Sequence, residues 1–459
     1  GRILAVHIDG TSNQFGQHST NVIQLYSQII KDDSQITYYN SGIGTYAAPS
    51  WKSLNYWKQV VDNSVDLGIA WNFEKIVINA YRWVADNFQP GDRIFLFGFS
   101  RGAYQVRALA AMIHKVGLIY KGNEEQIPFA YEIYADHNSE VPPMPTASAD
   151  AETQPPEAMS KRFKATFSRN VRVHFVGVWD TVSSIGIVRG KNLPGTVAPD
   201  NICYFRHALA LDERRVKFLP EYARGGAGPN PVPPATPDAD AEGNGGRVAS
   251  KPPNNPAKPH IKETWFTGTH SDIGGGNGLN PDLNRSGAPL LWMCYEAISC
   301  GLKMKLYNAK WKWDELGAVN ESLTGVWKLF EYMPFTRLSY KTHEEMTMRW
   351  HRGRGRKVQA GQKVHASVAF SPSGYEPKAI LPHLSKTDLS AKWKKLLDSR
   401  SEIKSSGETQ FICPNEWKDL LEMDIFDVTA AKTVIENLEN PAVDALTSLH
   451  RLTVLTWSG

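Results

Sequence analysis

Apolar residues along the first 120 positions follow two patterns that alternate. Residues 3–8 and 93–97 are near-continuous apolar runs, and such runs suit parallel strands that are covered on both faces. Residues 69–88 and 101–116 instead repeat apolar side chains at three- and four-residue intervals, which predicts amphipathic helices. The alternation of strand and helix predicts an α/β fold built on a doubly wound, mostly parallel sheet.

The same patterns predict further elements along the chain. We expect strands over residues 36–39, 171–179, 264–268 and 364–368, and helices over 21–30, 204–213 and 290–302. Thr20 precedes the first of these helices, and a threonine in that position is a good N-cap.

Two stretches without periodicity interrupt this order. Residues 141–160 and 225–260 are rich in Pro, Gly and small polar residues, a composition typical of exposed loops. Because strands and helices continue after both, we interpret them as insertions within one catalytic domain over residues 1–302. We expect the C-terminal extension, residues 303–459, to pack on that domain. Its many aromatic side chains favour core packing, and a lid or substrate platform is the alternative.

Composition narrows the classes of protein that fit. Of the 459 residues, 41% are hydrophobic, which is enough for a large core, and a net charge of +4 does not indicate a partner nucleic acid. The four cysteines include no CxxC pair, which excludes a zinc ribbon and fits a reducing compartment. No apolar run approaches the roughly 18 residues of a membrane span, and residues 1–8 are too short for a signal peptide. We therefore expect a cytoplasmic protein.

The sharpest chemical signal is the segment GFSRGA at residues 98–103. It fits the pattern G-x-S-x-G, follows an apolar strand and opens a helix, which is the context of the nucleophile elbow in α/β hydrolases. The flanking glycines relieve crowding in such a turn, and a helix N-terminus favours negative charge that develops near the hydroxyl. Ser100 is therefore the candidate nucleophile, with an ordinary Gly-rich turn as the alternative.

A nucleophilic serine needs a base and a carboxylate that orients the base. Asp180 directly follows one predicted strand, and His270 follows another. The carboxyl ends of parallel strands carry ligand-facing loops, and the chain order Ser, Asp, His is that of α/β hydrolases. We expect Ser100, Asp180 and His270 to form a catalytic triad. The alternatives are a helix or turn cap for Asp180 and a structural loop histidine for His270.

An acyl hydrolase also needs N–H donors for the oxyanion of its tetrahedral intermediate. We expect one donor from Arg101, the residue after the nucleophile, and a second from Gly10 or Thr11 at the end of the first strand. Asp9 would fix that loop by accepting its N–H groups. A simple tight turn is the alternative interpretation of this segment.

Five segments of the chain form an ordered set. They are DGTSN at 9–13, GFSRGA at 98–103, VWDTV at 178–182, RHALALDERR at 206–215 and GTHSDIGGG at 268–276. The set resembles a family of uncharacterised α/β hydrolases whose best-understood members are phospholipase effectors of bacterial type VI secretion systems. This resemblance covers residues 1–302 and implies a Ser–Asp–His hydrolase with Ser100, Asp180 and His270. WHRGRGR at 350–356 and VHASV at 364–368 are similar to fungal members of the family.

Two residues near the candidate triad and one basic segment are candidates for additional parts of the site. His207 lies in the predicted helix 204–213, either as a wall of the site or, as we favour, within a helix tied down by ion pairs. Asp272 lies close to His270 in the sequence, and we expect it to support the site. The arginines at 352–356 are candidates for contact with anionic headgroups at a membrane surface, but a solvated loop is the favoured interpretation.

We therefore interpret the chain as a serine hydrolase of the esterase, lipase or phospholipase type. It would cleave a carboxylic ester of a lipid-like or other small molecule through an acyl-enzyme, with no cofactor and no metal. One alternative is a metallohydrolase with Asp9, Asp180, His270 and Asp272 as ligands, although no close-spaced motif such as HExxH supports it. A catalytically idle binding module is another, which the intact Ser, Asp and His disfavour.

Overall fold

The computed structural model covers the chain in several ranges. It describes residues 1–10, 19–42, 64–140, 158–182, 193–196, 202–226, 260–277, 285–305, 319–325, 327–332, 337–338, 346–347, 350–359, 362–365, 367–368, 371–372, 375–380 and 423–424. The two predicted insertions lie outside the described residues except at their ends, and Thr11 lies outside them as well.

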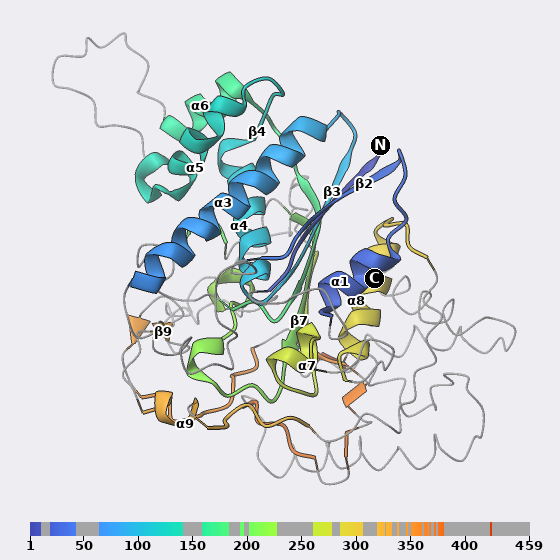
Figure 1. Cartoon of the computed structure of the whole chain (residues 1–459), viewed down its shortest axis with the longest axis vertical. Helices are drawn as coiled ribbons and strands as arrows, with labels where there is room; N and C mark the ends of the chain where they lie inside the picture. Colours follow the sequence, from blue (N-terminus) through green and yellow to red (C-terminus); the bar gives the residue numbers. More distant parts are fainter. Residues whose placement is uncertain are drawn as a thin grey trace, which may run out of the picture.

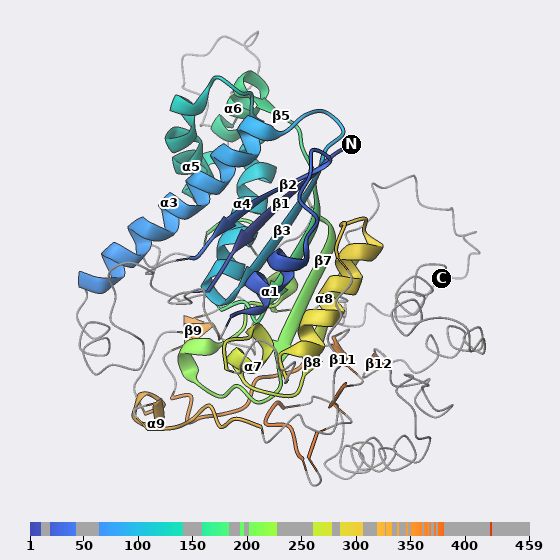
Figure 2. The same ribbon diagram turned by 45° about the vertical axis from the view of Figure 1, so that its right-hand side comes forward.

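A parallel sheet forms the centre of the molecule (Figures 1 and 2). Among the described residues it has eight strands in the order β12-β11-β8-β7-β6-β3-β1-β2. Only β12 runs antiparallel to its neighbour. The strands are β1 (Ile3–Ile8), β2 (Gln35–Asn40), β3 (Arg93–Phe99), β6 (Val173–Trp179), β7 (Ile202–Ala210), β8 (His260–Phe266), β11 (Lys363–Val364) and β12 (Met423–Asp424). The predicted α/β fold with a mostly parallel sheet is confirmed.

Helices cover both faces of this sheet. Figures 1 and 2 show α3 and α4 on one face, and α1 and α8 on the other. The helices are α1 (Asn21–Gln28), α3 (Ser64–Asn87), α4 (Ser100–Val116), α5 (Ile127–Ala135), α6 (Met159–Phe167), α7 (His270–Gly274), α8 (Gly287–Ser299) and α9 (Trp327–Phe330). Short 3-10 turns are η1 (Glu124–Gln126), η2 (His137–Glu140), η3 (Val216–Phe218) and η4 (Ala223–Gly226).

Two small antiparallel sheets lie outside the main one. They pair β4 (Leu118–Ile119) with β5 (Ser168–Arg169), and β9 (Arg337–Leu338) with β10 (Met346–Thr347). The first lies beside α5 and α6, and the second lies in the C-terminal extension.

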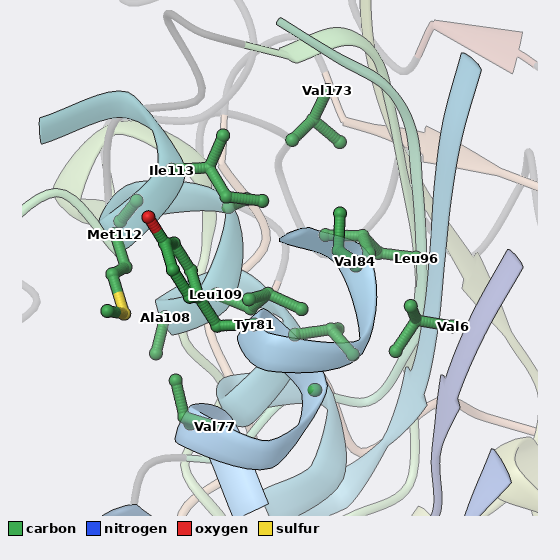
Figure 3. Packing of buried hydrophobic residues seen from close by; sticks show 14 of the residues in the cluster. Val6, Val77, Tyr81, Val84, Leu96, Ala108, Leu109, Met112, Ile113 and Val173 are labelled. Carbon is green, nitrogen blue, oxygen red and sulfur yellow. The ribbon is translucent and has the colours of Figure 1, made fainter. Parts of the chain in front are cut away.

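The two layers of helices create two hydrophobic cores, one on each face of the sheet. Successive side chains of a strand point to opposite faces, so Val6 of β1 joins one core while Ala5 joins the other. Figure 3 shows the first core, in which strand residues meet α3 and α4. Its labelled members are Val6, Val77, Tyr81, Val84, Leu96, Ala108, Leu109, Met112, Ile113 and Val173. These cores fix the strands whose ends carry the polar residues.

The predicted helix over residues 204–213 is wrong, because this segment forms the central strand β7. Ala and Leu at mixed spacing favour a helix locally, but burial between β6 and β8 decides the outcome. Arg206 and His207 point to opposite faces and are both fully buried. Each pairs with a buried carboxylate, Glu296 for Arg206 and Glu263 for His207. These pairs allow an arginine and a histidine to lie in a central strand.

The C-terminal extension joins the main sheet. Strand β11 pairs in parallel with β8, so that residues beyond 302 extend the sheet edge next to the strand that precedes His270. The predicted strand 364–368 is largely wrong: only Val364 lies in β11, residues 367–368 form a helical turn, and residue 366 lies outside the described residues. The division at residue 302 stays a prediction, as does a lid.

Gly102 in the first turn of α4 is the point where this helix touches β1. A Cβ at residue 102 would lie 2.3 Å from the carbonyl oxygens of both Ile8 and Asp9. Backbone atoms at the end of a buried strand cannot move aside, so only glycine fits between the helix and the strand.

We expect Gly102→Ala to lower the free energy of unfolding by about 3 kcal/mol, the cost of overpacking at a rigid site. Denaturant unfolding measures this. Gly122→Ala is the matched control, because a Cβ there would meet nothing within 4 Å. The left-handed backbone at residue 122 should cost this variant only about 1 kcal/mol. Equal losses in the two variants would mean that the contact between α4 and β1 is not tight.

Candidate active site

Ser100 occupies a strained turn between β3 and α4. Its backbone φ is 58°, in the left-handed region that residues other than glycine rarely adopt. The turn is tight enough that a Cβ on Gly98 would lie 2.6 Å from the carbonyl oxygen of Gly102. Both glycines of the motif are therefore required by the packing of the backbone around the serine. Ser100 is 8% exposed.

His270 is the first residue of α7, and a capping box fixes the turn that carries it. The side chain of Thr269 accepts from the helix backbone, while Asp272 Oδ2 accepts from the N–H and the hydroxyl of Thr269 at 2.8 and 2.9 Å. The other oxygen of Asp272 accepts from the side-chain amides of Asn277 and Asn320. Asp272 thus holds the helix start in place.

Two aromatic rings flank the imidazole of His270. The ring centroids of Phe99 and Phe218 lie 4.7 and 4.8 Å from its own. Phe99 lies so close to α7 that a Cβ on Gly274 would come within 1.9 Å of its ring. Arg215 packs on Phe218, with its guanidinium carbon 3.7 Å from the ring centroid. The rings exclude water from the imidazole and restrict its orientation.

The carboxyl ends of β3, β6 and β8 bring the three predicted triad residues together. The His270 Nε2 lies 2.9 Å from Ser100 Oγ, and its Nδ1 lies 2.5 Å from Asp180 Oδ2. All three side chains are buried. An Nδ1–H that donates to Asp180 leaves Nε2 as the acceptor for the serine hydroxyl. This is the order of contacts in a Ser–His–Asp triad.

Asp180 follows β6 in a left-handed conformation, with φ of 42°. Its Oδ1 accepts from the Ala210 N–H at 3.1 Å. Burial by itself raises the pKa of this carboxyl, but the charge of Arg356 and hydrogen bonds from His270 and Arg356 bring the pKa well below its usual range. The surroundings of Asp180 therefore favour its ionised form.

Burial lowers the pKa of His270, and the hydrogen bond and charge of Asp180 oppose this effect without cancelling it. A second carboxylate contributes: Glu213 accepts from the His270 backbone N–H at 3.2 Å. Glu213 is itself paired with Arg215 at 2.7 Å. The environment favours a neutral imidazole, which is the form that accepts a proton.

Arg356 is the residue that sequence reasoning missed. The solvated loop favoured for residues 352–356 is wrong at this position, because the Arg356 side chain is 1% exposed. Its Nη1 and Nη2 lie 2.5 and 2.8 Å from the two carboxylate oxygens of Asp180. Neighbouring Arg352 and Arg354 are exposed as expected. The alternation of Arg and Gly was the only local signal, and it does not tell which arginine is buried.

His207 lies beside the site, in β7 rather than in a helix. Its Nε2 accepts from the Thr181 N–H at 3.0 Å, and its Nδ1 lies 3.0 Å from Glu263 Oε1. Burial lowers its pKa, although the hydrogen bond with Glu263 opposes the shift. His207 therefore holds the backbone next to Asp180 and does not reach Ser100 in the hydrogen bonds of the described residues.

Asp9 ties the end of β1 to its neighbours. Its Oδ1 accepts from the Gly10 N–H at 2.6 Å, and its Oδ2 accepts from the hydroxyls of Thr20 and Tyr39 at 2.6 and 3.1 Å. The Gly10 N–H thus points at a carboxylate, as expected for a fixed loop. Roles of Arg101, Gly10 and Thr11 in oxyanion binding stay predictions, and Thr11 lies outside the described residues.

The four side chains of the metallohydrolase alternative are not arranged around a common point that could hold a metal ion. Asp180 faces a guanidinium, Asp9 accepts from one N–H and two hydroxyls, and Asp272 accepts from amides and Thr269. Each carboxylate is thus engaged with its own donors. Among the described residues, no group of three or more His, Cys, Asp and Glu side chains is arranged to hold a metal ion.

The structure is therefore an α/β protein with a buried serine, histidine and aspartate at the carboxyl edge of its sheet. Residues 2–296 match the family model described as "T6SS, Phospholipase effector Tle1-like, catalytic domain", and the chain belongs to this family. The family is of the phospholipase type. The family resemblance seen in the five sequence segments is confirmed.

Two further comparisons show proteins to which this chain is similar. The "Uncharacterized protein YEL023C" of Saccharomyces cerevisiae is 37% identical over 225 residues, which span 48% of this chain and 32% of the yeast protein. This similarity supports the fungal-like branch. A crystal structure of an uncharacterized protein from Pseudomonas aeruginosa has a TM-score of 0.32 and 16% identity, over 68% of this chain and 47% of that chain. Among the described residues, no helix has the length and apolar character needed to cross a membrane.

We expect Asp272→Ala to lower the free energy of unfolding by about 2 kcal/mol, because it removes a cap and leaves the Thr269 N–H without its acceptor. Asp32→Ala is the matched control: Asp32 accepts from the N–H and hydroxyl of Ser34 in an exposed turn, and its loss should cost less than about 0.5 kcal/mol. Similar losses in both would identify Asp272 as an ordinary turn residue.

Proposed function

We propose that this chain is a serine hydrolase that cleaves carboxylic esters, with Ser100 as nucleophile, His270 as base and Asp180 as the carboxylate that orients the imidazole. The observation that carries the proposal is the 2.9 Å contact between His270 Nε2 and Ser100 Oγ. A base within hydrogen-bond reach of a serine, itself held by a carboxylate, is the arrangement that activates a hydroxyl. The strained φ of Ser100 adds support, since strain persists at functional sites.

The reaction proceeds in two halves. Ser100 Oγ attacks the ester carbonyl carbon while its proton passes to His270 Nε2, and the tetrahedral intermediate then expels the alcohol, which takes that proton. Water next attacks the acyl-enzyme, gives its proton to the same nitrogen, and releases the acid as Ser100 regains its hydrogen. Asp180 accepts from Nδ1–H throughout and stabilises the transient imidazolium. These steps need no cofactor and no metal.

The oxyanion of each intermediate needs donors that do not move. Arg101 supplies the backbone N–H next to the nucleophile, at the start of the 17-residue helix α4, whose N-terminus favours negative charge. Gly10 or Thr11 supplies the second N–H in this proposal. The Gly10 N–H already donates to Asp9. Thr11 is therefore the preferred candidate for the second donor in this proposal.

The substrate class follows from the family. A phospholipase-type catalytic domain favours a lipid-like ester, and a lipid substrate implies contact with a membrane surface. Tyr332 and Trp350 support such contact, because they are 64% and 51% exposed. A hydrogen bond from the Arg352 N–H to the Glu331 carbonyl brings their segments together, and the Arg352 guanidinium lies 5.3 Å from the Trp350 ring. Aromatic rings favour the membrane interface and arginine favours anionic headgroups.

We expect Ser100→Ala to lower kcat/KM for a soluble p-nitrophenyl ester by about 10⁴-fold or more, because the nucleophile is lost. The free energy of unfolding should not fall. A fluorophosphonate should label the wild-type protein on the peptide that contains Ser100, and mass spectrometry of the digest locates it.

The control for this substitution is Ser139→Ala, which removes another buried hydroxyl and should keep both activity and labelling. Near-normal ester hydrolysis by Ser100→Ala would contradict the proposal. A chelator should leave the rate unchanged, and activity that falls with chelation and returns with added metal would favour the metallohydrolase instead.

We expect the double variant Tyr332→Ser with Trp350→Ser to hydrolyse lipid in anionic vesicles about tenfold more slowly, a loss of about 1.4 kcal/mol of binding. Hydrolysis of the soluble ester should stay the same. Tyr120→Ser is the matched control: Tyr120 is 53% exposed and packs on Arg169, next to β4, at the end of the molecule away from α9 (Figure 1). An equal loss in the control would rule out a specific membrane face.

A further inference from the structure

Arg356 reaches the site from outside the span that the family model matches. That span ends at residue 296, whereas Arg356 lies in the C-terminal extension. The backbone of Arg356 is anchored by its carbonyl, which accepts from the Ile380 N–H at 2.7 Å. Gly355 allows this close packing, because a Cβ there would lie 1.6 Å from the Lys378 carbonyl oxygen. These backbone contacts fix the position of the segment from which the Arg356 side chain enters the interior.

The Arg356 guanidinium uses its donors on three groups. Both carboxylate oxygens of Asp180 accept from it, and so do the carbonyls of Ala210 and Phe218. Asp180 Oδ2 is therefore shared between Arg356 Nη2 and His270 Nδ1. A planar guanidinium that grips both oxygens fixes the plane of the carboxylate, and with it the direction from which Asp180 meets the imidazole.

Three charged side chains act directly on His270: Asp180 after β6, and Glu213 and Arg215 after β7. Arg356, from the extension, reaches the imidazole through Asp180, whose carboxylate it pairs with. Arg215 compensates Glu213, and Arg356 compensates Asp180. With both pairs intact the two negative and two positive charges balance. Without Arg356, two carboxylates would face one guanidinium, and the imidazolium would become more favourable.

We propose that Arg356 is a positioning residue of the site: it fixes Asp180 against His270 and, by compensating the charge of that carboxylate, keeps the imidazole neutral and ready to accept a proton. This inference rests on the proposed hydrolase. It makes the C-terminal extension part of the catalytic unit, because the compensating cation lies outside the matched catalytic domain.

The sign of the expected pH effect follows from the charges. A cation near His270 disfavours its protonated form, so removal of Arg356 raises the pKa of His270. The histidine must be neutral to accept the serine proton, so kcat/KM falls as the pH drops through this pKa. The acid limb of the pH profile should therefore move to higher pH when the cation is lost. A purely structural role would lower the whole profile without moving the limb.

The test compares Arg356→Gln and Arg356→Lys with wild type, with kcat/KM for a soluble ester measured from about pH 4 to 9. The wild-type midpoint should lie below about 6.5, the ordinary pKa of histidine. In Arg356→Gln the midpoint should rise by about one pH unit, a further tenfold loss on the acid side. Arg356→Lys should keep the midpoint near wild type but lower the plateau, because an ammonium cannot grip both oxygens.

Arg354→Gln is the matched control, since it removes an exposed arginine two residues away and should leave both midpoint and plateau unchanged. A folded Arg356→Gln with a lower plateau and an unmoved midpoint would overturn the proposal. So would a midpoint that moves equally in Arg356→Lys and Arg356→Gln.

A second measurement needs no folded variant at position 356. NMR of wild-type protein with ¹³C-labelled histidine, with the His270 signal assigned by its loss in His270→Asn, gives the pKa of His270 directly. A value at or above about 6.5 overturns the role of Arg356 even if both variants fail to fold. If the proposed hydrolase activity is absent, wild type will neither hydrolyse esters nor react with a fluorophosphonate. Comparison of the His270 titration between wild type and Arg356→Gln still tests the effect of Arg356.

Discussion

The contact between the first turn of α4 and the end of β1 is the constraint on which the rest of the structure depends. Because Gly102 lies directly against the carbonyls of Ile8 and Asp9, the chain must reverse sharply after β3, and Ser100 takes up the left-handed conformation that results. The same contact sets the depth at which α4 packs against the sheet. A local steric limit thus positions a polar side chain at the sheet edge, where the ends of β6 and β8 bring the other two.

The sequence was informative wherever short-range pattern decides the structure. The apolar runs around Val6 and Leu96, the helix after Ser100 and the order Ser, Asp, His follow from neighbours in the chain, and the described fold agrees. β7 was missed because Arg206 and His207 are paired with Glu296 and Glu263, which lie 90 and 56 residues away. No local pattern reports such partners.

The candidate site shows the same division between local and distant signals. Ser100, Asp180 and His270 could be selected from motifs, and the structure brings their side chains together. Arg356 could not, because its carboxylate partner lies 176 residues away and its neighbours Arg352 and Arg354 are exposed. Buried carboxylates are costly unless compensated, so a partner for Asp180 could be expected, but its identity depends on how a distant segment packs.

The long distance along the chain between Asp180 and Arg356 has a consequence for synthesis. At about 5–20 residues per second, roughly 10–35 s separate the appearance of the two residues. During that interval β7, β8 and α8 are made, including the strand that pairs with β6 and the helix that packs on it. Asp180 can therefore gain its cation only after every strand from β1 to β8 has been made.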